Sequence, residues 1–307
     1  MNPVLKRTLC GLGVGVLVLG MFLYCPLVGI MPVILVLSTL AQMEFYQMAK
    51  RKYEPVAWVG LLMGGAWIAA AGVLGCAKYV PMLFLSCTPL MFLALIALCL
   101  LVLFGSHYRN PVGSISVTLM GFLYVPFLLS FFLLTTQLTC SPWLNADMQT
   151  SRVGLYTLFA LIAVAKFSDT GGFAFGMAFG KNKMCPSISP KKSWEGLAGS
   201  MLFSAVVAVA MLALARHFHW GDSLRFWNML TYPVVFVGGA AMAVLATVCD
   251  LIESRFKREF EVKDSSVFLP AGMGGLLDMF DSVLFIPALA YPLIYAYSCS
   301  NCLCVSW

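Results

Sequence analysis

The sequence contains very little charge. Only 10% of its 307 residues are Asp, Glu, Lys or Arg, whereas 61% are hydrophobic. Because roughly a quarter of the residues in a soluble domain are charged, this composition excludes an ordinary soluble protein. A net charge of +6 would suggest a nucleic-acid partner in a soluble protein. In so apolar a chain the positions of the basic residues matter more than their sum, and we expect a lipid-bilayer partner and no nucleic acid.

The sequence also lacks the features of a disulfide-rich or processed protein. Eight of its eleven cysteines are scattered singly through or beside apolar runs, which is typical of small core residues. The first apolar run has no convincing small-residue cleavage site, so no cleavable signal peptide is expected. Cys299, Cys302 and Cys304 lie beyond the last run without a fourth ligand nearby, and a metal site, lipidation or a disulfide stays open for them.

What the sequence does contain is a series of apolar runs. Most are close to the 17–25 residues that cross about 30 Å of hydrocarbon as a helix. We therefore predict an all-α, polytopic integral membrane protein with about nine transmembrane helices. The shorter runs 27–42 and 153–168 would also fit a core helix or a re-entrant segment. The runs cover residues 9–24, 27–42, 57–75, 80–104, 115–136, 153–168, 199–215, 232–249 and 283–298.

The polar residues divide the chain into two parts. Residues 1–150 have few charges inside the apolar runs and contain no phosphate-loop, metal-ligand or nucleophile motif. We predict that they form transmembrane scaffold helices. In residues 151–307, polar groups lie against the ends of the runs. This part is predicted to be a transmembrane catalytic region with polar loops that face the cytoplasm.

The basic residues fall in every second loop if the chain has nine spans. Lys and Arg are enriched in the cytoplasmic loops of membrane proteins, so we expect the amino terminus and these loops in the cytoplasm. The opposite loops, near 137–152 and 216–230, carry fewer and more balanced charges. The sequence thus predicts a multi-pass protein of the cell membrane whose active site faces the cytoplasm. The inner basic residues are Lys6, Arg7, Lys50, Arg51, Lys52, Arg109, Lys181, Lys183, Lys191, Lys192, Arg255, Lys257, Arg258 and Lys263.

A first polar cluster occupies residues 165–196. Ser168, Asp169 and Thr170 are expected to end an apolar helix. The glycines that follow allow close helix approach, either as a packing seam or beside a ligand. Residues 189–196 then place two lysines, two serines and a tryptophan just before the next run. That combination suits an anionic ligand at the membrane surface.

A second polar cluster, residues 250–282, holds seven of the chain's thirteen acidic residues. Charged side chains near a bilayer are costly, so their concentration in one stretch favours a functional site over a solvated loop. If the preceding helix continues, four polar residues at steps of four, three and four share one face. These are Asp250, Ser254, Lys257 and Glu261. Asp278 and Asp281, three positions apart, would share a face of the next helix.

This combination of residues suits a metal-bound polyphosphate. Mg²⁺ takes oxygen ligands, typically one or two carboxylates together with substrate phosphates and water. Lysine and arginine side chains would offset the remaining phosphate charge and reduce the repulsion when one phosphate attacks another. The glycine-bearing turn at 270–275 can expose backbone N–H groups to phosphate oxygens.

The two clusters resemble the phosphatidate cytidylyltransferases, also called CDP-diacylglycerol synthases. That family's downstream pattern runs S-x-x-K-R, four residues, K-D, five residues, then P-x-H-G-G-x-x-D-R-x-D. It is matched here by Ser254, Lys257, Arg258, Lys263, Asp264, Pro270, Gly274, Gly275, Asp278 and Asp281. The upstream pattern, D-S-G-A, F-G-K and S-P-x-K-T-W-E-G, is matched by Ser168, Asp169, Thr170, Phe179, Gly180, Lys181, Ser189, Pro190, Lys192, Ser193, Trp194, Glu195 and Gly196.

The chain departs from that pattern in two places. Its glycine turn, residues 270–275, is one residue longer than the family's and contains no histidine. The arginine between the last two aspartates of the pattern is replaced by Met279. The chain's three histidines lie elsewhere, so the roles of the family's histidine and arginine have no counterpart in these motifs.

The resemblance implies a nucleotidyltransferase of phospholipid biosynthesis that converts CTP and phosphatidate into CDP-diacylglycerol and diphosphate, with Mg²⁺ as cofactor. It implies Asp250 and Asp278 as metal ligands. The catalytic residues that it implies are Asp250, Lys257, Arg258, Lys263, Asp264, Asp278 and Asp281. The substrate-binding residues that it implies are Asp169, Lys192, Ser193, Trp194, Glu195, Ser254, Gly274 and Gly275. The sequence does not specify the oligomeric state, and a homodimer stays open.

Two alternative functions use some of the same features. A CTP-dependent kinase of a polyprenol or phytol would need similar groups, with an alcohol as the acceptor and CDP as the product. A non-enzymatic transporter would account for the many spans and for the acidic residues at their ends, but the sequence contains no detectable internal repeat.

Overall fold

The computed structural model describes residues 27–74, 80–104, 110–138, 148–218, 227, 230–262 and 275–300. Six helices in this part are long and apolar enough to cross a membrane. They confirm an all-α, polytopic membrane protein. The described residues also contain a short two-stranded sheet that the sequence did not predict. The run at 9–24 lies outside the described residues, and the total of about nine spans stays a prediction.

The chain folds into two compact units. Unit 1 comprises Met1–Leu133 and Phe260–Met279, and unit 2 comprises Leu134–Glu259 and Phe280–Trp307. Each unit therefore combines segments that lie far apart in the sequence. The boundary predicted near residue 150 separates scaffold helices from a catalytic region and does not concern compact units, so it stays a prediction.

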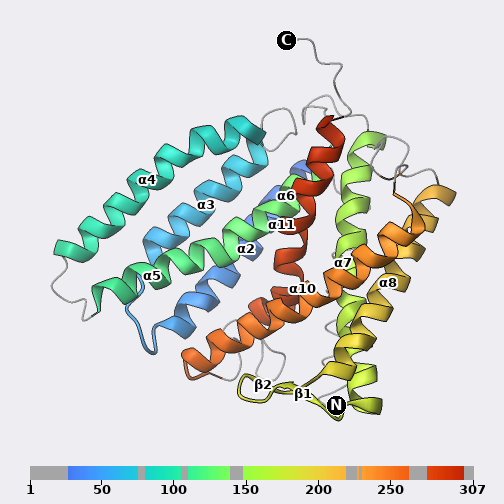
Figure 1. The fold of residues 1–307 in the computed structure, drawn as a ribbon. Helices are drawn as coiled ribbons and strands as arrows, with labels where there is room; N and C mark the ends of the chain where they lie inside the picture. Colours follow the sequence, from blue (N-terminus) through green and yellow to red (C-terminus); the bar gives the residue numbers. More distant parts are fainter. Residues whose placement is uncertain are drawn as a thin grey trace, which may run out of the picture. The chain divides into compact units, whose positions relative to one another are not determined.

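Unit 1 is built from apolar helices, shown in Figure 1. The helix α5 begins at Pro111, where the Asn110 side chain accepts a hydrogen bond of 3.0 Å from the Gly113 amide. Pro126 lies in the π-helical turn that follows, because a proline has no N–H for the regular helical ladder. The elements are α2 (Leu27–Ala49), α3 (Ala57–Leu74), α4 (Val80–Phe104), α5 (Pro111–Phe122), η2 (Leu123–Phe127) and the start of α6 (Leu128–Thr136).

Buried hydrogen bonds join the helices of unit 1. The Gln42 amide donates to the Gly60 carbonyl at 2.8 Å, and the Tyr46 hydroxyl donates to the Thr118 carbonyl at 2.8 Å. These bonds tie α2 to α3 and α5 in a region where water does not compete. Glu44, fully buried on α2, accepts a bond of 2.9 Å from the Leu277 amide. Glu44 thereby satisfies an otherwise free N–H group in the first turn of α11 (Leu276–Ser300).

Unit 2 contains the long helices α7 (Met148–Phe179), α8 (Trp194–His217) and α10 (Tyr232–Glu259), together with most of α11. Figure 1 shows α8 running beside α7, and α10 packs against α8. The chain between α7 and α8 forms an antiparallel hairpin of β1 (Lys183–Cys185) and β2 (Ser189–Ser193).

Glycines form the packing seam between α7 and α8. A Cβ atom built on Gly171 would lie 2.7 Å from the Gly199 carbonyl oxygen, and one on Gly196 would lie 3.0 Å from the Gly172 carbonyl oxygen. Only glycine allows the two backbones to approach so closely. Of the two interpretations left open by the sequence, the packing seam is therefore confirmed for these glycines. Gly172 also lines a pocket in unit 2, so the glycine seam lies next to that pocket.

Two predicted helix features were wrong. The helix α7 does not end at Ser168–Thr170 but continues to Phe179, because packing against α8 outweighs the low helix propensity of its glycines. The helix α10 ends at Glu259, and Glu261 follows it with a φ of 56°. Glu261 therefore does not share a helical face with Asp250, although Ser254 and Lys257 do lie on the same helix as Asp250.

Candidate active site

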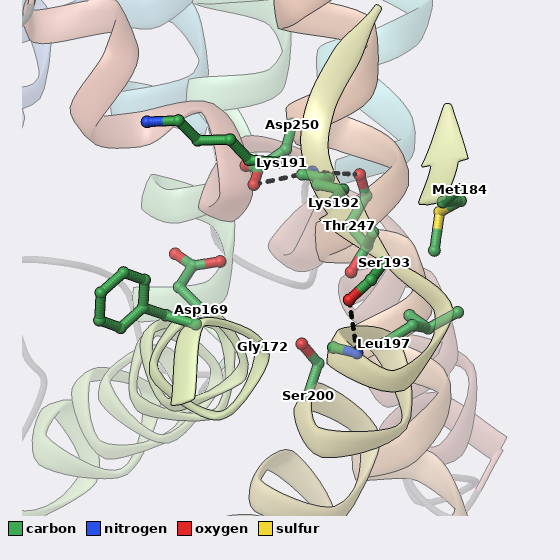
Figure 2. A pocket seen from close by; sticks show the side chains of 12 residues that line it. Asp169, Gly172, Met184, Lys191, Lys192, Ser193, Leu197, Ser200, Thr247 and Asp250 are labelled. Carbon is green, nitrogen blue, oxygen red and sulfur yellow. Dashed lines mark hydrogen bonds and ion pairs between the residues drawn. The ribbon is translucent and has the colours of Figure 1, made fainter. Parts of the chain in front are cut away.

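A cavity of about 220 Å³ opens in unit 2 between α7, the β-hairpin, α8 and α10. Figure 2 shows the Asp169 carboxylate facing it from α7, across from Lys192 and Asp250. Both predicted polar clusters thus contribute to one pocket. The polar side chains that line it belong to Asp169, Lys191, Lys192, Ser193, Ser200, Thr247 and Asp250.

The β-hairpin is fixed to α8 by residues of the upstream motif. The Ser193 hydroxyl caps α8 by accepting a hydrogen bond of 3.2 Å from the Gly196 amide. The Glu195 carboxylate accepts a bond of 2.8 Å from the Asn182 side chain and a further bond from the Asn182 amide. Both residues therefore stabilise the hairpin that presents Lys192. Trp194 begins α8 with an exposed indole ring.

Lys192 joins the two sequence clusters. Its ammonium group lies 3.0 Å from a carboxylate oxygen of Asp250 and donates to the Thr247 carbonyl at 3.0 Å. About a quarter of each charged side chain is exposed. The pair is therefore partly shielded from water but still borders the cavity, where Lys192 could meet an anionic ligand.

A second polar group joins α7 to α11. The Lys166 ammonium donates to the Ser282 hydroxyl at 3.0 Å, and that hydroxyl donates to the Asp169 carboxylate at 3.0 Å. Lys166 and Asp169 are also 3.7 Å apart as an ion pair. Ser282 is completely buried. The carboxylate that faces the pocket is thus held by side chains from two helices.

Three carboxylates influence one another in unit 2. Asp281 interacts electrostatically with Asp250 and with Asp169, and Asp169 also interacts with Asp250. Within the residues that the structure describes, no three acidic, histidine or cysteine side chains are close enough to form a complete metal cage. Mg²⁺ needs only one or two carboxylates when phosphates and water complete its shell. The oxygen donors of this pocket therefore fit a magnesium ion that arrives with a polyphosphate.

The end of α10 carries the next part of the downstream motif. Lys257 forms an ion pair of 2.7 Å with Glu253, whose side chain is only 2% exposed. The ammonium of Lys257 is therefore already engaged by a buried carboxylate. Ser254 is partly buried and Arg258 is exposed on the same helix.

Asp278 belongs to the part of α11 in unit 1. Its carboxylate accepts a hydrogen bond of 2.9 Å from the Gly275 amide, at the start of the helix. Asp250 belongs to unit 2, and the pairing of these two predicted metal ligands stays a prediction. Lys263, Asp264 and Gly274 lie outside the described residues, as do the side chains of the three terminal cysteines.

The model of the family described as "Cytidylyltransferase family" matches residues 5–297. The chain belongs to this family. The match extends over both units and includes every residue of the two motifs.

Curated relatives carry a more specific name. The chain is 38% identical over 133 residues to a phosphatidate cytidylyltransferase of Staphylococcus haemolyticus, covering 43% of this chain and 46% of the relative. It is 37% identical over 139 residues to the enzyme of that name from Haemophilus influenzae, covering 45% and 46%. For the one from Staphylococcus aureus strain COL the identity is 36% over 138 residues, covering 45% and 48%. The matched part spans about half the length of these curated relatives.

The predicted site residues of this cytidylyltransferase-family protein omit several contributors to the pocket region, among them Ser200, Lys166, Ser282 and Thr247. Lys166 was available as a signal, because a lone lysine within an apolar run is a functional hypothesis in a membrane protein. Ser282 directly follows the last aspartate of the motif but belongs to no predicted set. The Thr247 carbonyl could not have been identified from residue type, since any residue has a backbone carbonyl.

Proposed function

We propose that the chain is a phosphatidate cytidylyltransferase that converts CTP and phosphatidate into CDP-diacylglycerol and diphosphate. The observation that carries this proposal is the contact between Lys192 of the upstream motif and Asp250 of the downstream cluster at one pocket. Family membership and the names of the curated relatives support the same reaction. Cations and carboxylates around one cavity are what a magnesium-bound nucleotide requires.

The proposed reaction needs no protein nucleophile. A phosphate oxygen of phosphatidate attacks the α-phosphorus of CTP and forms the new P–O bond. The bond from the α-phosphorus to the oxygen that bridges to the β-phosphorus breaks, and diphosphate leaves with that electron pair. Charge therefore accumulates on the leaving group while two anions approach each other, so positioned cations are the principal contribution of the protein.

The residues of the pocket can supply this contribution. Lys192 is held by Asp250 and by the Thr247 carbonyl, so its ammonium is oriented before substrate arrives. Lys191 lines the same pocket and provides a second cation for phosphate oxygens. Asp169 and Asp250 line the pocket and would hold Mg²⁺ there. Asp278, which the resemblance implies as a metal ligand with Asp250, stays a separate prediction. When bound, Mg²⁺ would neutralise phosphate charge.

We also propose that the pocket faces the cytoplasm in the cell membrane. The hairpin lysines and the basic residues at the end of α10 belong to two segments in which positive charge is concentrated, and the Lys192–Asp250 ion pair joins the hairpin to α10. Labelling of a Lys191→Cys variant with a membrane-impermeant maleimide tests this orientation. We expect extra labelling over the wild type in inside-out vesicles. Extra labelling in right-side-out vesicles would contradict it.

The reaction itself is tested with purified protein in detergent, CTP, phosphatidate and Mg²⁺. We expect CDP-diacylglycerol and diphosphate in equal amounts, and no product when a chelator is present. Release of CDP with a polyprenol or phytol acceptor would instead identify the kinase.

A homodimer stays a prediction, and the mass of the detergent-solubilised protein tests it.

A further inference from the structure

A lysine lies within the apolar stretch of α7. Lys166 is near the middle of the candidate membrane span Gly154–Phe179, about 18 Å along the helix from either end at 1.5 Å per residue. An ammonium group at such a position is costly unless it is paired or faces a polar cavity. A lysine at this position therefore needs a specific partner for its charge.

The partners of Lys166 come from its own helix and from α11. It donates to the buried Ser282 hydroxyl at 3.0 Å and lies 3.7 Å from the Asp169 carboxylate. Ser282 in turn donates to the same Asp169 oxygen that pairs with Lys166. The three side chains form a closed triangle, so none of them can turn away without breaking two of the contacts.

The triangle adjoins a group of negative charges. Asp281, directly before Ser282, interacts electrostatically with Lys166 as well as with Asp250 and Asp169. Asp250 has its own cation in Lys192. Lys166 therefore acts on the carboxylates of both α7 and α11, and Lys192 also acts on Asp169. Without Lys166 these acidic side chains would repel one another more strongly, although the Lys166 and Asp169 side chains are 44% and 40% exposed.

We propose that Lys166 is a positioning residue, a built-in counter-ion that holds the Asp169 carboxylate against Ser282 and keeps the acidic side chains of α7 and α11 together before a divalent cation binds. The role of Lys166 rests on the proposed function only where that divalent cation is concerned. Its contacts with Asp169 and Ser282 are independent of which reaction the protein performs. Lys166 is not among the residues that line the pocket.

A double-mutant cycle on the full chain tests the counter-ion role without metal or substrate. In detergent with a chelator, Lys166→Met should lower the thermal unfolding temperature, and Lys166→Arg should restore most of it. The loss should be smaller when Lys166→Met is made in an Asp169→Asn background, because the charge that needs compensation is then absent. Lys183→Met, at an exposed position on β1, serves as the matched control and should leave the temperature unchanged.

Magnesium provides the second measurement. We expect Mg²⁺ to raise the unfolding temperature of Lys166→Met by more than that of the wild type, because the ion replaces the missing charge. An equal loss in the Asp169→Asn background would overturn the proposal and indicate a packing role for the lysine. If Mg²⁺ stabilises neither protein while the cycle shows coupling, the metal assignment fails and the counter-ion role stands.

Discussion

The Lys192 ammonium lies 3.0 Å from the Asp250 carboxylate, although 57 residues separate the two in the chain. The contact orients both side chains at the edge of one cavity. Each neutralises the other until a ligand arrives, which makes it less costly to hold both charges at a partly buried position. A phosphate group of a ligand would bind the Lys192 ammonium, and a metal ion would bind the Asp250 carboxylate.

We predict that Lys192→Met lowers kcat by about 10²- to 10³-fold, because it removes a preorganised cation from the developing charge. Asp250→Asn should also reduce activity. Since the two residues act as a pair, the double variant should lose less than the product of the two single losses. Formation of CDP-diacylglycerol under saturating CTP measures all three.

The matched control for this pair is Arg255→Met, which removes an exposed charge from the same helix as Asp250. It should retain nearly the activity of the wild type. Losses that simply multiply in the Lys192 and Asp250 double variant would show that the two residues act independently.

Asp278→Ala is expected to abolish activity without preventing membrane insertion, because the side chain is a proposed metal ligand at a polar helix end. The variant also removes the hydrogen bond from the Gly275 amide, so its stability must be measured alongside turnover. Asp278→Asn keeps an acceptor for that bond and should be equally inactive. Substantial turnover in either variant at high Mg²⁺ would refute the metal assignment.

Glu44→Ala should destabilise the protein by about 1–3 kcal/mol, because it leaves the buried Leu277 amide without its acceptor. Glu44→Gln retains a carbonyl oxygen and should remain close to the wild type. Gln47→Ala, on the exposed side of the same helix, is the control. Thermal unfolding in one detergent ranks the four proteins. Equal unfolding temperatures for Glu44→Ala and the control would mean that this bond contributes nothing to stability.

Gly199→Ala and Gly238→Ala should change stability in opposite directions. A Cβ atom on Gly199 would lie 2.8 Å from the Gly171 carbonyl oxygen and would also clash with Phe175, so it must push α7 and α8 apart. A Cβ atom on Gly238 would meet no atom within 4 Å. There alanine should stabilise α10 by up to about 1 kcal/mol through its helix propensity. Thermal unfolding of both variants measures the difference. A Gly199→Ala protein as stable as the wild type would contradict the close packing of α7 against α8.

Most of the membrane-crossing architecture could be predicted from hydrophobicity. The run at 27–42, for which a core helix or a re-entrant segment was also open, forms the helix Leu27–Ala49. The run at 115–136 lies within the continuous helical stretch Pro111–Thr136. Helix ends were harder to predict from the sequence. The polar Ser168–Thr170 segment and the glycines after it predicted the end of a helix, but α7 continues to Phe179 because those glycines pack against α8.

The candidate site was predictable in its residue types and only in part in its contacts. Asp169, Lys192 and Asp250 were selected from the motifs, and the structure brings all three to one pocket. The resemblance implied Ser193 and Glu195 as substrate-binding residues, which stays a prediction. The structure adds that Ser193 caps α8 and that Glu195 binds Asn182. Such local bonds depend on the hairpin between α7 and α8, which no periodic pattern in the sequence indicated.

The sequence by itself determined the membrane class, the approximate spans and the family, because hydrophobic length and motif spacing are properties of a linear chain. The tertiary structure alone decided that Lys192 would pair with Asp250, and that Lys166 would reach Ser282 across 116 positions. Contacts of that range depend on how helices pack and on which faces meet. Packing depends on side-chain shape at many positions at once, and for that reason spacing within a motif does not reveal it.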